Sequence, residues 1–575
     1  MIKLVLAETD IKSKGKVFMK TKTMKKMLSL FLAVLMIALA IPFTLLTVGA
    51  EDSLIKSASI TLTSGTTNDE NERAYGSVAG MIDGDVDGPD GERYYQSKHI
   101  NADDKYYSLV NGKFVRDTSA VHDYYGYAKF ELTSEISLES MTAASNSEVR
   151  LINGVPLEKY TIVYNSDDVD YSKRAAEYIS EQIKVRTSVE LVVKEDDEGN
   201  FAHEIVVGET ARDISKKLEA PKKNTTEFAI LADDNHIALE GDYFVIAAAA
   251  YFFVETYVAG EYFDAQIPKE TCVHEPIVKE AKNYILLIGD GMGVVQTLLF
   301  DVMKDENIGN KAYSDGEDIF YGYLLPNQGL SRTNSLSGVT DSSAGGTALA
   351  SGHKTYNNYV GKDKLLNDVQ SLTELAGSLG KATAVMSTEA ATGATPASFS
   401  AHANDRNDKS VISASQLVLK NKYGTIIECD YNYYDLSGVD KIQNKVTTTL
   451  NALSKNQNGF FLMYEEAHID KHCHNQDINS TFDAIVRFNQ VIGVVMEYAF
   501  YNPETFVLIT ADHETGGLTY SGGKAMYTSG GNHTGKDVPV FAYGIGTEKF
   551  NEEIVENVEI PKAIAALWGV ERFGQ

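Results

Sequence analysis

Cysteine is scarce in this sequence, since 575 residues hold only three, at positions 272, 429 and 473. Three cysteines exclude a disulfide scaffold and a cysteine-rich metal site, and we expect no disulfide. Basic residues are also few: 52 Lys and Arg stand against 80 Asp and Glu, for a formal net charge of −28. Because so acidic a surface repels phosphate backbones, the sequence argues against nucleic-acid binding. At about 150 residues per domain, the length suggests three to four domains.

Long apolar runs are missing except near the start, where one extends from Met27 to Val48. Four lysines within residues 20–26 precede this run, and small residues follow it up to Ala50. That order predicts a secretory signal peptide over residues 1–50, cleaved near Ala50. An uncleaved membrane anchor is the alternative, because about 20 apolar residues can span a bilayer. We expect a mature protein that is secreted or associated with the cell envelope.

Residues 51–145 are rich in Asp, Gly, Tyr, Ser and Thr. Alternating runs at 58–63 and 127–132 predict strands, so we expect a β-rich accessory segment. The acidic stretch 83–91 is either a calcium loop or a solvated turn. It lacks the closing glutamate of an EF-hand, which favours the turn.

Two short stretches of this segment, 79–84 and 130–136, resemble a discoidin-type carbohydrate-binding sandwich. The resemblance implies contact with carbohydrate or cell wall through the accessory regions.

Residues 146–278 change in pattern and predict a small α/β accessory domain with no catalytic group of its own. The expected elements are strands at 160–164, 189–193 and 204–207 and helices at 171–185 and 243–258. The last helix is apolar, but it is shorter than 18 residues and contains Glu255, which favours a core helix over a membrane span. This part resembles accessory domains of secreted bacterial enzymes.

Residues 280–575 alternate strands with helices. The predicted strands are 284–288, 382–386, 460–464, 505–510 and 538–543, and the predicted helices are 343–351, 371–379 and 481–500. Nearly continuous apolar strands between helices indicate a buried sheet, so we expect an α/β fold with a mostly parallel sheet sandwiched by helices.

Polar side chains gather where these strands end, which is where ligands bind in such sheets. They are Asp290, then Glu465, Asp470 and His474, then Asp512 and His513, and finally His533 between glycines. Any one of them alone has an ordinary explanation as a turn, cap or surface ion pair. Together, Asp and His in this density indicate a metal site, and these ligand types suit zinc.

A further motif, at residues 339–348, places Ser342 at the mouth of a helix beside Asp341. Free N–H groups and the helix dipole attract an anion such as phosphate. An ordinary helix cap is the alternative. The small residues 343–346 favour an anion site, because they would let a substrate approach the backbone.

With these motifs, residues 280–575 resemble the alkaline phosphatases. The resemblance rests on Asp341-Ser342-Ser343, on Gly352–Asn357 and on the strand-end ligands above. It implies that Ser342 is the nucleophile and that Arg406 binds phosphate.

The resemblance also implies two zinc ions and one magnesium ion. Asp470, His474 and His533 would hold the first zinc. Asp512 and His513 would hold the second zinc, with the Ser342 hydroxyl beside it and with Asp290 bridging it to the magnesium. Thr395 and Glu465 would complete the magnesium shell. The implied reaction is hydrolysis of phosphate monoesters through a phosphoserine. A metal would lower the pKa of the serine hydroxyl, and two metals would serve both apical oxygens of an in-line displacement.

Three departures from the family pattern stand out. Gly393 occupies the position where many members have Asp or His, which leaves the identity and affinity of the third metal open. Without an acidic partner at Gly393, we expect Lys471 to contact phosphate directly or through water. His472 is either a group supporting the site or an exposed side chain. The 59 residues from Arg406 to Glu465 leave little room for the large insertions of some members.

Two other functions compete with the phosphomonoesterase. One is a diesterase or sulfatase of the same superfamily, although those enzymes usually carry Thr or a modified Cys or Ser as nucleophile. The other is a binding protein in which residues 51–278 dock carbohydrate or cell wall. The physiological substrate and the oligomeric state cannot be inferred from the sequence.

Overall fold

The structure, a computed structural model, describes residues 150–168, 170–259, 264–300, 319–431, 439–521 and 524–575, together with the strands between residues 55 and 132. The predicted signal peptide lies outside the described residues, as does most of the acidic stretch 83–91. By its contacts the chain forms two compact units, residues 1–157 with 259–266 and residues 158–258 with 267–575. The predicted domain boundaries near residues 145 and 278 stay predictions.

Antiparallel strands make up the described part of the first unit. The strands predicted at 58–63 and 127–132 lie within β1 (Ile55–Ser64) and β6 (Tyr124–Leu132), which pair with each other. The sheet continues through β3 (Arg93–Gln96) to β2 (Val86–Asp87), and β4 (Tyr106–Val110) forms a hairpin with β5 (Lys113–Asp117).

The second unit begins with a six-stranded sheet, which with its helices we call the small α/β part. Its strand order is β10-β9-β11-β13-β12-β15. The strands are β9 (Thr161–Tyr164), β10 (Val193–Glu195), β11 (Glu204–Val207), β12 (Phe228–Ala232), β13 (His236–Gly241) and β15 (Cys272–His274). The first four in this order are parallel, and β12 runs antiparallel to both of its neighbours.

The helices of the small α/β part follow the predictions closely. Helix α5 (Ser172–Thr187) covers the predicted 171–185, and α7 (Ile246–Phe253) lies within 243–258, between a 3-10 turn and a π turn. The predicted strand 189–193 was wrong, because the chain leaves α5 through Ser188 in a left-handed conformation and first pairs with β9 at Val193. Among the described helices, none is both long and apolar enough to cross a membrane.

The C-terminal half, residues 280–575, contains an eight-stranded sheet with the order β19-β18-β20-β16-β21-β26-β17-β27. Its strands are β16 (Asn283–Gly289), β17 (Asn327–Arg332), β18 (Ala382–Ser387), β19 (Ile426–Cys429), β20 (Phe460–Glu466), β21 (Thr505–Thr510), β26 (Val538–Tyr543) and β27 (Ile554–Glu556). All pairs are parallel except those of β26, which runs against both β21 and β17.

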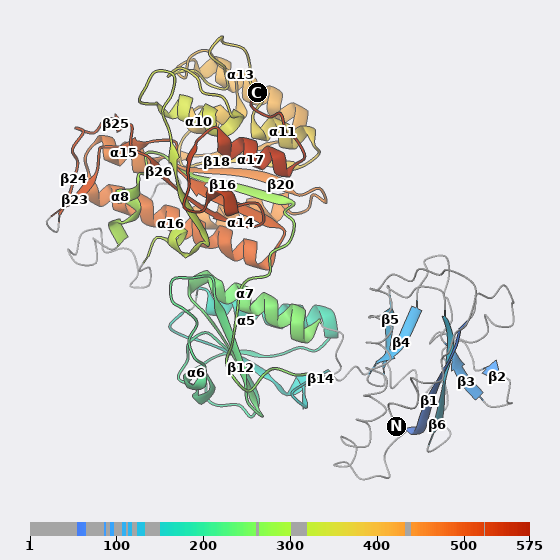
Figure 1. Cartoon of the computed structure of the whole chain (residues 1–575). Helices are drawn as coiled ribbons and strands as arrows, with labels where there is room; N and C mark the ends of the chain where they lie inside the picture. The colour runs from blue at the N-terminus through green and yellow to red at the C-terminus, as the bar shows by residue number, and fades with distance from the viewer. Residues whose placement is uncertain are drawn as a thin grey trace. The chain divides into compact units, whose positions relative to one another are not determined.

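Helices cover this sheet on both faces (Figure 1), which confirms the predicted mostly parallel sheet between helices. One face carries α10 (Ser342–Ser351), α11 (Leu372–Ser378) and α17 (Glu559–Leu567), and the other carries α14 (Val439–Leu453) and α16 (Ile478–Tyr501). Leu286, Phe461 and Leu508 of the central strands are fully buried in the core cluster. Burial of this continuous apolar strand surface on both faces explains why the strands read as uninterrupted hydrophobic runs.

Candidate active site

Three neighbouring parallel strands bring the predicted polar residues to one edge of the sheet. Asp290 follows β16, Asp512 follows β21, and β16 pairs with β20 and β21. Glu465 lies inside β20 rather than after it, and all three carboxylates are at least nine-tenths buried. Buried carboxylates are costly unless positive charge or hydrogen bonds compensate them.

Asp470 and His474 lie four residues apart on the short helix α15 (His468–His474), so both side chains project from one face of this helix. His474 Nε2 is 3.1 Å from Asp470 Oδ2, and His533 Nε2 is 3.5 Å from Asp470 Oδ1. The structure therefore joins Asp470 and His474 with His533, which lies about sixty residues further along the chain.

The tautomers of the two rings point to a cation between them. His474 Nδ1 donates to the Gly531 carbonyl oxygen at 2.6 Å, and His533 Nδ1 donates to that of Thr340 at 2.9 Å. In the neutral rings, each Nε2 therefore carries a lone pair, yet the two Nε2 atoms face each other at 3.2 Å. A positive ion between them would remove this repulsion, and a backbone carbonyl on the other ring nitrogen is typical of metal-binding His.

His513 is fully buried between two carboxylates. Its Nε2 lies 3.3 Å from Asp512 Oδ2 and 3.4 Å from Asp290 Oδ1. Burial lowers the pKa of His513 well below its ordinary value, so this ring is neutral and can offer a lone pair to a metal. Asp290, Asp470 and His513 converge closely enough to share one ion, so Asp470 belongs to both groups of ligands.

Several buried oxygen atoms around these rings have no hydrogen bond. Within the described part of the chain, they are Asp290 Oδ1, Thr395 Oγ1, Glu465 Oε1 and Asp512 Oδ2. Burial and then the Asp470 carboxylate raise the pKa of Asp512 to about 7; burial and then Glu389 raise that of Glu465 to about 8. Burial and then Asp512 raise the pKa of Asp290 as well. All four oxygens belong to predicted ligands, and bound cations would satisfy them and restore the ionised carboxylates.

Ser342 is the first residue of α10, and Asp341 caps this helix by accepting a hydrogen bond from Ala344 N at 2.9 Å. The Ser342 hydroxyl lies 3.2 Å from His513 Nε2, within the ligand group. The predicted hydroxyl at a helix mouth is therefore beside the predicted metal ligands.

The small residues after Ser342 have a different role from the one expected. A Cβ atom at Gly345 would lie 2.8 Å from the Asp512 carbonyl oxygen, and one at Gly346 would lie 3.1 Å from Ser398. These glycines let α10 pack against the end of β21 and against α12 (Ala394–Ser400). Close helix packing, and not substrate access, accounts for them.

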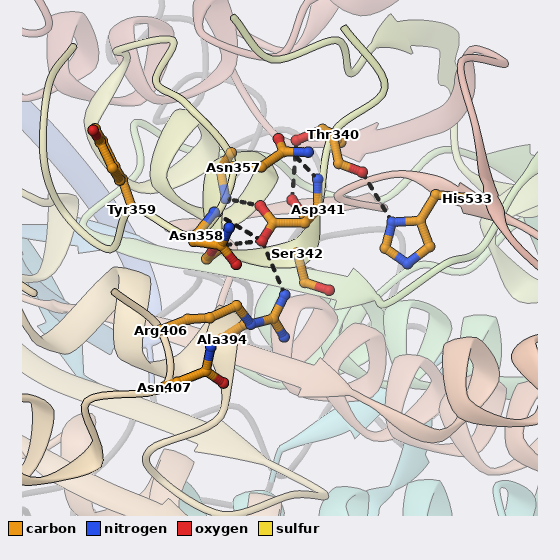
Figure 2. A network of polar contacts seen from close by, with 12 residues as sticks. Thr340, Asp341, Ser342, Asn357, Asn358, Tyr359, Ala394, Arg406, Asn407 and His533 are labelled. Carbon is orange, nitrogen blue, oxygen red and sulfur yellow. Dashed lines mark hydrogen bonds and ion pairs between the residues drawn. The ribbon is translucent and has the colours of Figure 1, made fainter. Parts of the chain in front are cut away.

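Arg406 reaches toward the same helix mouth (Figure 2), with Nη1 3.2 Å from Asp341 Oδ2. Asp341 is held in turn by Asn357 and Asn358, since Asn357 Oδ1 accepts from Asp341 N and Asn358 N donates to Asp341 Oδ2. The ring of His533 is also bound to this loop, because its Nδ1 donates to the Thr340 carbonyl oxygen (Figure 2). One hydrogen-bonded loop thus positions the serine, the arginine and a metal ligand.

Lys471 has an acidic partner after all, contrary to the expectation from Gly393. Its Nζ lies 2.9 Å from Glu389 Oε2, and Glu389 is 8% exposed. Sequence reasoning missed Glu389; its only signal is an acidic residue shortly after β18, the strand next to β20. His472 is half-buried, and its ring centre lies 6.1 Å from that of His468.

Known proteins with a similar sequence are alkaline phosphatases. The alkaline phosphatase family model matches residues 281–435 and 432–532. Alkaline phosphatases 3 and 4 of Bacillus subtilis are 28% and 27% identical to 42% of this chain, which corresponds to 62% and 63% of their own lengths. This chain therefore spans less than two thirds of these curated relatives.

Two of the similar solved structures are of one alkaline phosphatase and its mutant. The enzyme from the Antarctic bacterium TAB5 is 28% identical with a TM-score of 0.43, over 50% of this chain and 98% of that one. A mutant of it with Mg bound is 27% identical with a TM-score of 0.43, over 52% of this chain and 100% of that one. Residues 281–532, which contain most of the predicted motifs, are thus similar to the alkaline phosphatase family by the family model and by these curated relatives.

Proposed function

We propose that this protein is a metal-dependent phosphomonoesterase in which Ser342 attacks the phosphorus atom. One observation carries the proposal. The Ser342 hydroxyl, at a helix N-terminus, lies 3.2 Å from His513 Nε2, among buried oxygen atoms that lack hydrogen bonds. Such an arrangement suits an anionic substrate and cationic cofactors together.

The residues present fit two zinc ions and one magnesium ion. Asp470, His474 and His533 would hold the first zinc; Asp512, His513 and Ser342 the second; Asp290, Thr395 and Glu465 the magnesium. Mixed imidazole and carboxylate ligands suit zinc, and an oxygen-only set suits magnesium. When bound, these ions supply the positive charge that lowers the pKa of a hydroxyl or water and stabilises charge on phosphate.

The side chains of the chain perform the remaining steps. The Ser342 oxygen loses its proton and attacks phosphorus while the P–O bond to the alcohol breaks, and the departing alkoxide takes up a proton. Water then attacks the phosphoserine, the bond between Ser342 oxygen and phosphorus breaks, and one proton of the water restores the serine hydroxyl as phosphate leaves. Arg406, near Asp341, is placed to hold two equatorial phosphate oxygens with its planar guanidinium group. The N-terminus of α10 adds backbone N–H groups and the favourable end of the helix dipole.

Lys471 was predicted to contact phosphate either directly or through water. Because Glu389 pairs with Lys471 at 2.9 Å, we propose that its ammonium reaches phosphate only through water. From the sequence alone we also propose export from the cytoplasm and contact of residues 51–278 with carbohydrate or cell wall.

The function is tested with the purified full chain supplied with zinc and magnesium. We expect an aryl phosphate monoester to be hydrolysed faster than the matching diester and sulfate esters, and a chelator to abolish the reaction. Re-addition of both metals should restore it. Faster hydrolysis of the diester or sulfate would favour the other members of the superfamily, and hydrolysis untouched by chelator would refute the metal-dependent mechanism.

A further inference from the structure

Glu389 occupies the space that a side chain at position 393 would fill. A Cβ atom built on Gly393 would lie 1.7 Å from Glu389 Oε1 and 2.2 Å from its carboxyl carbon. The backbone of Gly393 (φ −59°, ψ 163°) is one that any residue adopts. Glycine is therefore required here for space and not for conformation, because the Glu389 carboxylate already stands in that place.

The Glu389 carboxylate is built into its site by specific contacts. Its side chain is 11% exposed, and Oε2 lies 2.9 Å from Lys471 Nζ. Its backbone N–H donates to the Ser387 hydroxyl at 3.0 Å, and that hydroxyl donates to Glu465 Oε2. One serine thus links the residue to a predicted magnesium ligand.

The charges around this point favour a divalent cation. Glu389, Glu465 and Asp290 supply three carboxyl groups, whereas Lys471 supplies a single ammonium group, which lies 2.9 Å from Glu389 Oε2. One side-chain oxygen each of Glu465, Asp290 and Thr395 is buried without a hydrogen-bond partner, and a bound cation would satisfy these oxygens.

We propose that Glu389 is the acidic residue of the third metal site, where it replaces the side chain missing at position 393 and makes the site bind Mg²⁺. The proposal rests on the proposed function for the existence of that site. It assigns Glu389 as a positioning residue that acts through the metal and its bound water, not as a group that touches phosphate. The alternative is that Glu389 only pairs with Lys471 and stabilises the fold.

Measurement of Mg²⁺ binding to the zinc-loaded full chain distinguishes a role of Glu389 at the metal site from a role in pairing with Lys471 alone, and it needs no activity assay. We expect Glu389→Gln to weaken Mg²⁺ binding about 10- to 100-fold, as loss of an outer-shell group does, with zinc content unchanged. Glu428→Gln is the matched control, because Glu428 lies on β19 beside β18 and pairs with Lys445 at 3.0 Å. It should leave Mg²⁺ binding unchanged. Calorimetry and metal analysis provide both readouts.

Moving the carboxylate back to position 393 gives a second test. Gly393→Asp alone should lower the melting temperature, because its Cβ atom overlaps Glu389. The double variant Glu389→Ala with Gly393→Asp should fold like the wild type and restore Mg²⁺ affinity to within a few-fold. This variant also covers the case in which Glu389→Gln fails to fold.

The proposal is overturned if Glu389→Gln binds Mg²⁺ as the wild type does. It is also overturned if the folded double variant binds Mg²⁺ no better than Glu389→Ala. A zinc-loaded protein that hydrolyses no phosphate ester, yet binds Mg²⁺ in a Glu389-dependent manner, would refute the proposed function and leave this assignment standing.

Discussion

The second unit contains two largely parallel sheets with helices packed on them. Candidate catalytic residues gather at the edge of only one of these sheets in the part of the chain that the structure describes. In the ranges that the structure describes, both groups of three or more converging metal ligands lie in the C-terminal half. The small α/β part also has acidic residues after its strands, including Asp168 after β9 and Asp242 after β13. The same general architecture therefore does not by itself create a site.

The two edges differ in how their polar groups are used. In the small α/β part, Asp168 accepts from Ser172 Oγ at 2.8 Å, and Glu240 accepts from Ser215 Oγ at 2.8 Å. In the C-terminal half, oxygens of Asp290, Glu465 and Asp512 are buried without a hydrogen bond. A buried polar group without a hydrogen bond requires an explanation, and for several carboxylates at one edge a bound cation is such an explanation.

The largest expected difference is between two serines, each of which is the first residue of a helix. Ser342→Ala should lower phosphomonoesterase activity by roughly 10³-fold or more, because loss of a nucleophile removes its chemical step. Ser172→Ala should leave activity unchanged and cost about 1 kcal/mol of stability, since only its hydrogen bond to Asp168 is lost. Steady-state kinetics and denaturant unfolding measure the two effects. Equal activity of the two variants would contradict the assignment of Ser342.

Two arginines give the next largest effect. Arg406→Lys should reduce kcat/KM about 10- to 100-fold, because a bidentate bond to phosphate worth ~1.5–3 kcal/mol is lost. Arg212→Lys disturbs a buried pair with Glu204, in which Arg212 Nε lies 2.9 Å from Glu204 Oε2. It should lower the melting temperature and leave kcat/KM unchanged. If Arg406→Lys changes only the stability and leaves kcat/KM unchanged, the assignment of Arg406 to phosphate binding is wrong.

The smallest effect concerns two acid–histidine pairs, one near each sheet. His402 Nε2 lies 3.1 Å from Glu374 Oε1 in the C-terminal half, and His236 Nδ1 lies 3.1 Å from Asp233 Oδ1 in the small α/β part. Burial alone would lower the pKa of His402, but its hydrogen bond to Glu374 raises it overall. Burial would raise the pKa of Glu374, but His402 lowers it overall.

The sign of the pH dependence follows from these shifts. The raised pKa of His402 gives stability that is present below pH ~6.5 and lost as pH rises through the folded value. The lowered pKa of Glu374 gives stability that is present above pH ~4.3 and lost as pH falls through its folded value. His402→Gln should therefore cost about 1 kcal/mol near pH 5–6.5 and less at pH 9. A pH series of denaturant unfolding curves tests this, with the more exposed His236→Gln expected to cost less. A cost independent of pH would contradict it.

Much of the C-terminal half could be predicted because burial leaves a direct trace in the sequence. Strands β21 and β26 have the predicted bounds, since Glu504 and Asp537 directly precede their apolar runs and Thr510 and Gly544 end them. Helix α11 starts at the Ser371 cap and ends just before Gly380, whose φ of +75° favours glycine. The reversal of β26 could not be predicted, because a strand buried on both faces reads the same in either direction.

The candidate site was predicted where each ligand follows a strand or shares a helical turn. Asp290, Asp470, His474, Asp512 and His513 all lie where those rules placed them. Glu389 was missed because its position depends on the irregular turn between β18 and α12, which has no period to detect. Helix α13 (Lys409–Tyr423) was missed because it is largely exposed and has only three buried side chains.

The hydrogen bond from His533 to Thr340 has a consequence for the synthesis of the chain. It joins residues 193 positions apart, and the atoms that surround Ser342 come from residues as late as 533. Contacts of such long sequence separation form late in folding. A polypeptide released early by the ribosome would contain the serine but not the last ligand or its link to the nucleophile loop. We therefore expect a fragment that ends before His533 to lack phosphatase activity, although it contains Ser342.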